Sequence, residues 1–180
     1  MATRNFQLGR ETKSKEKFLI LGVIMMRDNR FVAIHRGGPL TKDHHHQLMR
    51  WARKCSEHLL PLIDQKIDQR LIHALSVAKE WEKEKVTVGE ARKASVSAHA
   101  LARESSNPII IAVARSIGHA VATAHMADHS LGAALYALKA VKNVGKSVDA
   151  ERKWQNEQLP SEIKELVLTT MSLKEKHFKI

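Results

Sequence analysis

Apolar residues recur every three or four positions from Thr41 onward, the spacing that places them on one side of an α-helix. In the first such segment the apolar positions are Leu48, Trp51, Ala52, Cys55, Leu59 and Leu62. Thr41 is a favourable N-cap residue, and Pro61 is expected to kink or end the helix. The pattern therefore predicts a long amphipathic helix that begins after Thr41.

The same periodicity predicts a series of further helices, separated by residues typical of helix ends. Asn107 and Pro108 suit an N-cap and a first helical position, and Gly145 suits a helix end. Asp128 or Ser130 is expected to cap the helix that Gly145 terminates. The expected helices cover 68–83, 89–105, 108–125, 131–144, 149–158 and 161–170.

The segment before the helices has a different pattern. Two aliphatic, β-branched runs flank the turn-like sequence RDNR, so residues 16–37 predict a β-hairpin that packs on the helices. The alternative is a short buried helix followed by a loop. Residues 1–15 are polar and charged and are expected to be flexible, and 171–180 are expected to form a tail that is loose or docked by Phe178. The fold class is thus mainly α, a compact bundle of six or seven helices over 41–170 in a single domain, 1–180.

Composition narrows the kind of core and the kind of partner. Hydrophobic residues make up 43% of the chain but aromatic residues only 4%, so alanine, leucine, isoleucine and valine must fill the core. Alanine at helix contacts allows backbones to approach closely, which favours an α-rich fold. The net charge of +11 indicates an anionic partner, such as nucleic acid, anionic lipid or an acidic protein surface.

The cysteine content and the hydropathy predict a cytoplasmic protein. Cys55 is the single cysteine of the sequence, so no intramolecular disulfide can form. The apolar run 18–26 is about half the length of a membrane span and is not followed by a small-residue cleavage site. We therefore expect no membrane partner.

Histidines are the first candidates for metal chemistry. His125 and His129 have the i, i+4 spacing of a helical metal pair, and Asp128 adjoins them. His99 is the best candidate for a further ligand. Against a metal site, a helix break near Asp128 would spoil the geometry of the pair. The tract at 44–46 reads as a polar helix start, because successive helical residues do not face one ion.

Catalysis finds little support in the sequence. Cys55 and His58 lie one turn apart, but Cys55 belongs to the apolar stripe, where a thiol is usually inert. Between Ser105 and Val148 the only carboxylate is Asp128, so this part of the chain lacks the paired carboxylates of acid–base hydrolysis. No glycine-rich phosphate loop occurs. We predict no enzyme activity and no cofactor.

Arginines and histidines form a more promising group. Arg92, His99 and Arg103 fall on one face of the third predicted helix, and Arg115 and His119 are one turn apart on the fourth. If these faces meet, they form a pocket for an anion or a patch for an acidic partner. The alternative is that the arginines extend into solvent while the histidines pack, neutral, between helices.

Nucleic acid fits the charge but not the rest of the sequence. The chain has one tyrosine and no run in which aromatic and basic residues alternate to stack bases. No helix-turn-helix with a basic recognition helix stands out. Any nucleic-acid binding is therefore expected to be non-specific and confined to low salt.

Four segments resemble a known family in their order and spacing. They are WARKCSEHLLPLI, RLIHALSVAKEWEK, ARKASVSAHALAR and ARSIGHAVATAHMADHSLGAALYALKAV. Together they resemble a bacterial and archaeal family of immunity proteins associated with toxin–immunity systems. The resemblance covers residues 40–157.

The resemblance implies an all-α, intracellular protein that binds and neutralises a cognate toxin, with no catalytic residues to carry over. Because the chain is strongly basic, the toxin is expected to present an acidic or apolar face rather than a cationic one. A homodimer is compatible with a helical protein of this size. The alternatives are a helical protein that binds a metal or an anion through its histidines and arginines, and a basic protein associated with nucleic acid.

Overall fold

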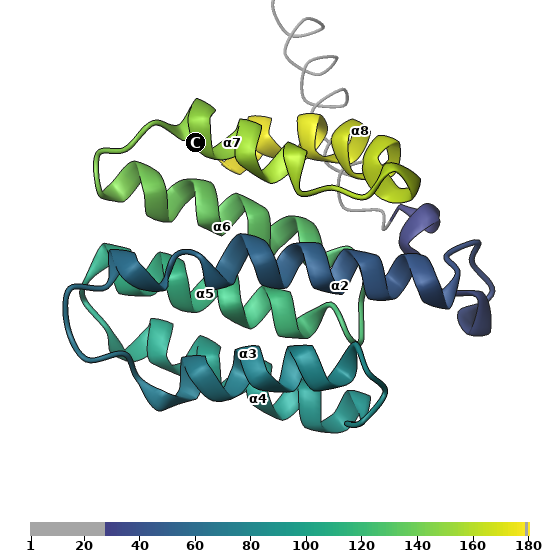
Figure 1. Ribbon diagram of the computed structural model, residues 1–180, viewed down its shortest axis with the longest axis horizontal. Helices are drawn as coiled ribbons and strands as arrows, with labels where there is room; N and C mark the ends of the chain where they lie inside the picture. Colours follow the sequence, from purple (N-terminus) through teal and green to yellow (C-terminus); the bar gives the residue numbers. More distant parts are fainter. Residues whose placement is uncertain (1–27, 179) are drawn as a thin grey trace, which may run out of the picture.

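The computed structural model describes residues 28–178 and 180, which form seven α-helices and no strand (Figure 1). The α-helices are α2 (Lys42–Glu57), α3 (Gln69–Trp81), α4 (Val88–Glu104), α5 (Pro108–Ala122), α6 (His129–Asn143), α7 (Val148–Glu157) and α8 (Ser161–Phe178). The 3-10 turns are η1 (Asn29–Phe31), η2 (Ile34–Arg36) and η3 (Leu60–Leu62). The predicted helical bundle is confirmed.

Side-chain caps begin several of these helices where the sequence places them. Thr41 Oγ1 accepts a hydrogen bond from the backbone N–H of His44 at 3.2 Å and starts α2. Asn107 Oδ1 accepts one from Ile109 at 2.8 Å, and Pro108 is the first residue of α5. Each cap satisfies a backbone donor that the first helical turn leaves without a partner.

Three of the helices form a row, and two others pack on one side of that row. Helices α4, α5 and α6 lie side by side in chain order, α2 packs across α5 and α6, and α3 packs across α4 and α5 (Figure 1). Helices α7 and α8 pack at the α6 end of the row. The other side of the row therefore faces outward. No helix within the described residues is long and apolar enough to cross a membrane.

Small residues allow α2, α5 and α6 to meet closely. Ala52, Ala120 and Ala133 are fully buried and pack together at the junction. Beside them, Ser116 Oγ donates a hydrogen bond to the Ala133 carbonyl at 2.8 Å and lies 2.7 Å from Ser56 Oγ. The buried hydroxyls therefore have partners, so their burial carries no desolvation penalty without compensation.

The tract His44 to His46 differs from the polar helix start that the sequence suggests. His45 is buried, because its position on α2 lies on the side that also carries Leu48 and Met49. Its Nε2 lies 2.6 Å from the Thr123 carbonyl, and its ring lies against Trp81. One histidine of the three thus ties α2 to the end of α5.

The predicted N-terminal β-hairpin is wrong for the part that the structure describes. Its first apolar run, 18–26, lies outside the described residues, as do residues 1–15. The second run forms η1 and η2, and its only described bridge joins Ala33 to Leu40. Phe31 and Ala33 are both buried, and Phe31 packs against helices. Burial of alternate residues does not require a strand partner.

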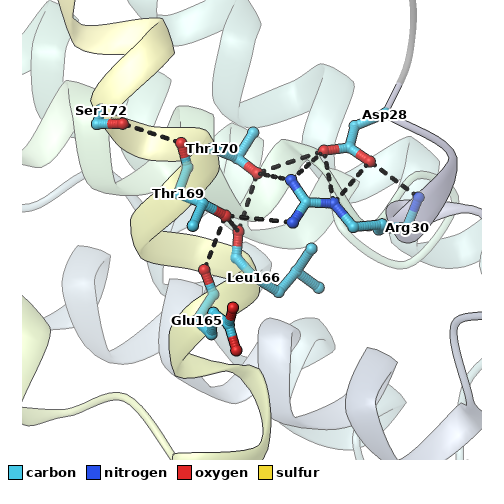
Figure 2. A network of polar contacts seen from close by, with 7 residues as sticks. All are labelled: Asp28, Arg30, Glu165, Leu166, Thr169, Thr170 and Ser172. Carbon is cyan, nitrogen blue, oxygen red and sulfur yellow. Dashed lines mark hydrogen bonds and ion pairs between the residues drawn. The ribbon is translucent and has the colours of Figure 1, made fainter.

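Arg30 connects the segment before α2 to α8 through hydrogen bonds (Figure 2). Its guanidinium is paired with the Asp28 carboxylate at 2.7 Å and donates hydrogen bonds at 3.2 Å to the hydroxyls of Thr169 and Thr170. The bond from Arg30 lowers the pKa of the Asp28 carboxyl below its usual value. The planar fork of arginine can pair with both carboxylate oxygens and still reach the two hydroxyls, a fixed geometry that the single ammonium of lysine does not reproduce.

Replacing Arg30 with lysine or alanine should loosen the segment without unfolding the bundle. The backbone N–H groups of Ile34 and Leu40, which hold the turn together, should exchange with deuterium faster, by up to about five-fold, because the ion pair contributes up to about 1 kcal/mol at an exposed site. Amides of α5 should be unaffected. Equal protection of Ile34 and Leu40 in the parent and in Arg30→Ala would contradict this role.

Candidate binding face

Four histidines come together on the outward side of the α4–α5–α6 row. His99 lies on α4, His119 on α5, His125 in the connection after α5, and His129 at the start of α6. Ring centroids are 5.0 Å apart for His99 and His119, 5.2 Å for His119 and His129, and 5.0 Å for His125 and His129. We refer to these four residues as the histidine cluster.

Hydrogen bonds define how the protons are placed in the cluster. The Arg115 guanidinium lies 3.3 Å from His99 Nδ1. Because arginine can only donate, His99 Nδ1 must accept, so the neutral ring carries its proton on Nε2. His119 Nδ1 lies 3.1 Å from His129 Nδ1, so one of these two nitrogens donates and the other accepts. Both contacts require that His99 and at least one of the other pair be neutral.

The surroundings of the cluster disfavour its protonated form. The pKa of His99 is lowered to about 4, first by burial and then by the charge of Arg115. The pKa of His119 is lowered to about 3, again first by burial and then by His129 and His99. Burial also lowers the pKa of His125, and Arg92 and Arg36 act in the same direction. His99, His119 and His125 are therefore uncharged at neutral pH.

Two glycines provide the space that the rings occupy. A Cβ atom on Gly118 of α5 would lie 2.6 Å from the His99 ring, and one on Gly132 of α6 would lie 2.9 Å from the His119 ring. Each histidine therefore lies directly over a glycine of the neighbouring helix. A glycine inside a helix costs about 1 kcal/mol relative to alanine, so these two positions give up helix stability to admit a ring.

Gly118→Ala should displace the His99 ring and lower the free energy of unfolding by about 1–3 kcal/mol, because overpacking outweighs the gain in helix propensity. Gly89→Ala is the matched control: Gly89 is also helical, but a Cβ there meets nothing closer than 3.7 Å. That variant should be slightly more stable than the parent. Chemical denaturation of both measures the difference, and a stabilised Gly118→Ala would refute the close packing.

Arginines around the cluster differ from the other arginines of the structure. Five arginines elsewhere form ion pairs with carboxylates: Arg30, Arg50, Arg53, Arg70 and Arg152. Four others form none with a carboxylate among the described residues: Arg36, Arg92, Arg103 and Arg115. All four lie close enough to the cluster to lower the pKa of one of its histidines. We call the four histidines and these four arginines the histidine–arginine face.

The structure thus brings together the five residues proposed from the sequence for an anion or partner site: Arg92, His99, Arg103, Arg115 and His119. Their part in binding remains a prediction. Sequence reasoning missed Arg36, which donates to the His125 carbonyl at 3.2 Å, and Tyr136, which stacks on His119 at 5.3 Å. Helical glycines beside histidines were the available signal, since such glycines indicate a close approach.

The C-terminal part of α8 reaches the same side of the bundle. Residues 171–178, which the sequence assigns to a tail, continue α8. The ring of Phe178 lies edge-on to Tyr136 with centroids 4.9 Å apart. Tyr136 is therefore packed between His119 and Phe178.

The metal interpretation of His125, Asp128 and His129 remains a prediction without a structural counterpart. No group of three or more histidine, cysteine, aspartate or glutamate side chains among the described residues is arranged to hold a metal ion. His129 Nδ1 is already paired with His119. The helix break expected near Asp128 is confirmed, since α5 ends at Ala122 and α6 begins at His129.

Cys55 and His58 do not form a catalytic pair. Cys55 is fully buried, and burial raises the pKa of its thiol well above the usual value, so the thiolate is absent at neutral pH. His58 instead stacks on Trp154 and lies 3.1 Å from the Glu151 carboxylate. The prediction that Cys55 belongs to the apolar core is confirmed.

Fold and face together define a mainly α protein in which the described arginines without a described carboxylate partner surround one histidine cluster. Residues 38–162, more than half of the chain, match the family described as "Imm-5 like putative immunity protein", and the chain belongs to this family. The match confirms the resemblance seen over residues 40–157. No curated protein matches the chain, and no solved structure does.

Proposed function

We propose that the protein acts without catalysis, by binding a partner toxin and neutralising it. Membership of an immunity protein family supports a protein partner. The observation that carries the proposal is the histidine–arginine face, where four arginines have no carboxylate partner among the described residues, while the five other described arginines do. Guanidinium groups without a carboxylate partner in their own protein can pair with carboxylates that a protein ligand supplies.

The test begins with the reading frames adjacent to the gene. Each is expressed in a bacterial host alone and together with this protein, and growth is measured. The proposal predicts a frame whose product stops growth, restored growth on co-expression, and a complex of the two proteins that survives size-exclusion chromatography. If every adjacent product is harmless, or if toxicity persists on co-expression with no complex, the immunity role is refuted.

The alternative of a nucleic-acid-associated protein predicts a different result from the same material. Purified protein would then retain nucleic acid, and its affinity for DNA or RNA would persist near physiological salt with a steep salt dependence. Affinity for nucleic acid that disappears at that salt concentration supports the protein-binding proposal instead. The net charge of +11 alone accounts for weak binding at low salt.

A further inference from the structure

The exposed arginines of α4 are placed as a line on its outward side. Arg92 and Arg103 are eleven residues apart, which is about 16 Å along a helix and nearly a whole number of turns. His99 lies between them on the same side of α4. Both arginines are exposed, and neither is engaged by a carboxylate of the described residues. A partner that approaches α4 therefore meets two exposed guanidinium groups that no described carboxylate engages.

Arg115 adds a third guanidinium that is already fixed in place. Its hydrogen bond to His99 Nδ1 on α4 engages one nitrogen, Nη1, and the residue is half-buried. The remaining N–H groups of the fork stay available for an acceptor. Because the side chain is held before binding, less rotamer entropy is lost when an acceptor arrives.

Carboxylates suit this arrangement better than nucleic acid does. Base stacking needs open aromatic rings beside the cations, but Tyr136 is stacked on His119 and contacted by Phe178. Guanidinium groups pair with carboxylates through two parallel hydrogen bonds. The spacing of Arg92 and Arg103 matches a surface rather than a single small anion, which could not reach both.

We infer that the histidine–arginine face is the docking surface for the partner, and that the partner presents aspartate and glutamate side chains to Arg92, Arg103 and Arg115. This inference rests on the proposed function, since it names the surface and the chemistry through which the toxin is bound. Other described arginines pair with carboxylates of this chain, but these three do not. The partner thus supplies the carboxylates for them.

The test compares two charge reversals of equal size. Arg92→Glu with Arg103→Glu changes the face, while Lys153→Glu with Lys164→Glu changes exposed residues of α7 and α8. Both double variants lower the net charge by the same amount, so long-range attraction of an anion falls equally in the two. Thermal melts check that each is folded. The probe is fluorescently labelled poly-L-glutamate, with a single-stranded oligonucleotide as the comparison, at about 0.1 M salt.

The parent and the Lys153/Lys164 variant are expected to bind poly-L-glutamate within about three-fold of each other, and the Arg92/Arg103 variant at least about ten-fold more weakly. Equal weakening in both variants would mean that binding follows net charge alone and would overturn the inference. The inference is also overturned if the face variant loses the oligonucleotide selectively and keeps poly-L-glutamate.

The toxin from the neutralisation experiment separates the inference from the function. Where the parent neutralises a toxin and the Arg92/Arg103 variant does so equally well, the docking surface is wrong and the immunity role stands. Where no toxin is neutralised but poly-L-glutamate binding is lost only in the face variant, the acidic-ligand surface stands and the immunity role fails.

Discussion

Trp51→Ala should lower the free energy of unfolding by about 3–5 kcal/mol, the largest effect expected of a single change in this protein. Trp51 is 1% exposed and packs among apolar residues of α6 and α8. Its indole N–H donates to the backbone carbonyl of Gln155 at 2.9 Å, so the side chain also ties α2 to α7. Truncation leaves a cavity at the point where these helices meet, and removes the hydrogen bond as well.

Two variants separate the cavity from the hydrogen bond. Trp51→Phe keeps most of the ring volume but loses the N–H group, and should lower the free energy of unfolding by about 1–2 kcal/mol. Trp154→Ala is the control for a partly exposed ring, here stacked on His58, and should lower it by less than Trp51→Ala. Urea denaturation followed by circular dichroism measures all three. A cost below about 1 kcal/mol for Trp51→Ala would show that this junction does not hold the helices together.

Lowering the pH from 7 to 5 should destabilise the protein through the histidine cluster, by about 2–3 kcal/mol for His99 and His119 together. This figure allows for solvent screening at the partly exposed His99. In the unfolded chain both imidazoles bind a proton near pH 6.5, whereas in the folded protein their pKa values are about 4 and about 3. The unfolded state therefore binds more protons throughout this window. Stability is full above pH 6.5 and declines as the pH falls toward 4.

The double variant His99→Gln with His119→Gln isolates this effect from other titrating groups. Between pH 7 and pH 5, its free energy of unfolding should fall less than that of the parent. The difference between the two changes should be about the same 2–3 kcal/mol, whatever the stability of the variant at pH 7. His73→Gln, an exposed histidine on α3, provides the control. If the double variant shows the same pH dependence as the parent, the two rings do not carry the effect.

Helices could be predicted closely because their signals are local. Thr41, Asn107 and Pro108 mark helix starts through contacts within one turn, and α7 and α8 begin close to the starts of the expected ranges 149–158 and 161–170. The N-terminal segment could not be predicted in this way. The alternating burial of Phe31 and Ala33 is common to a strand and to an extended turn that lies on helices, and only tertiary contacts decide between them.

Only part of the candidate site could be predicted from the sequence. Helical periodicity places Arg92, His99 and Arg103 on one side of α4, but whether that side meets Arg115 depends on how α4 and α5 pack. Arg36 was missed because the position of its segment depends on the contact between Arg30 and α8, and α8 is far away in the sequence. No periodic pattern reports such a contact.

Helix α5 lies at the centre of the bundle, against α2, α3, α4 and α6, and it carries Arg115 and His119 on its one outward side. The centre of the proposed docking surface thus lies on a helix that four other helices pack against, and not on a loop. Such a surface is rigid before contact, so complex formation requires little ordering of this protein, and mutations that weaken the core around α5 will weaken recognition as well.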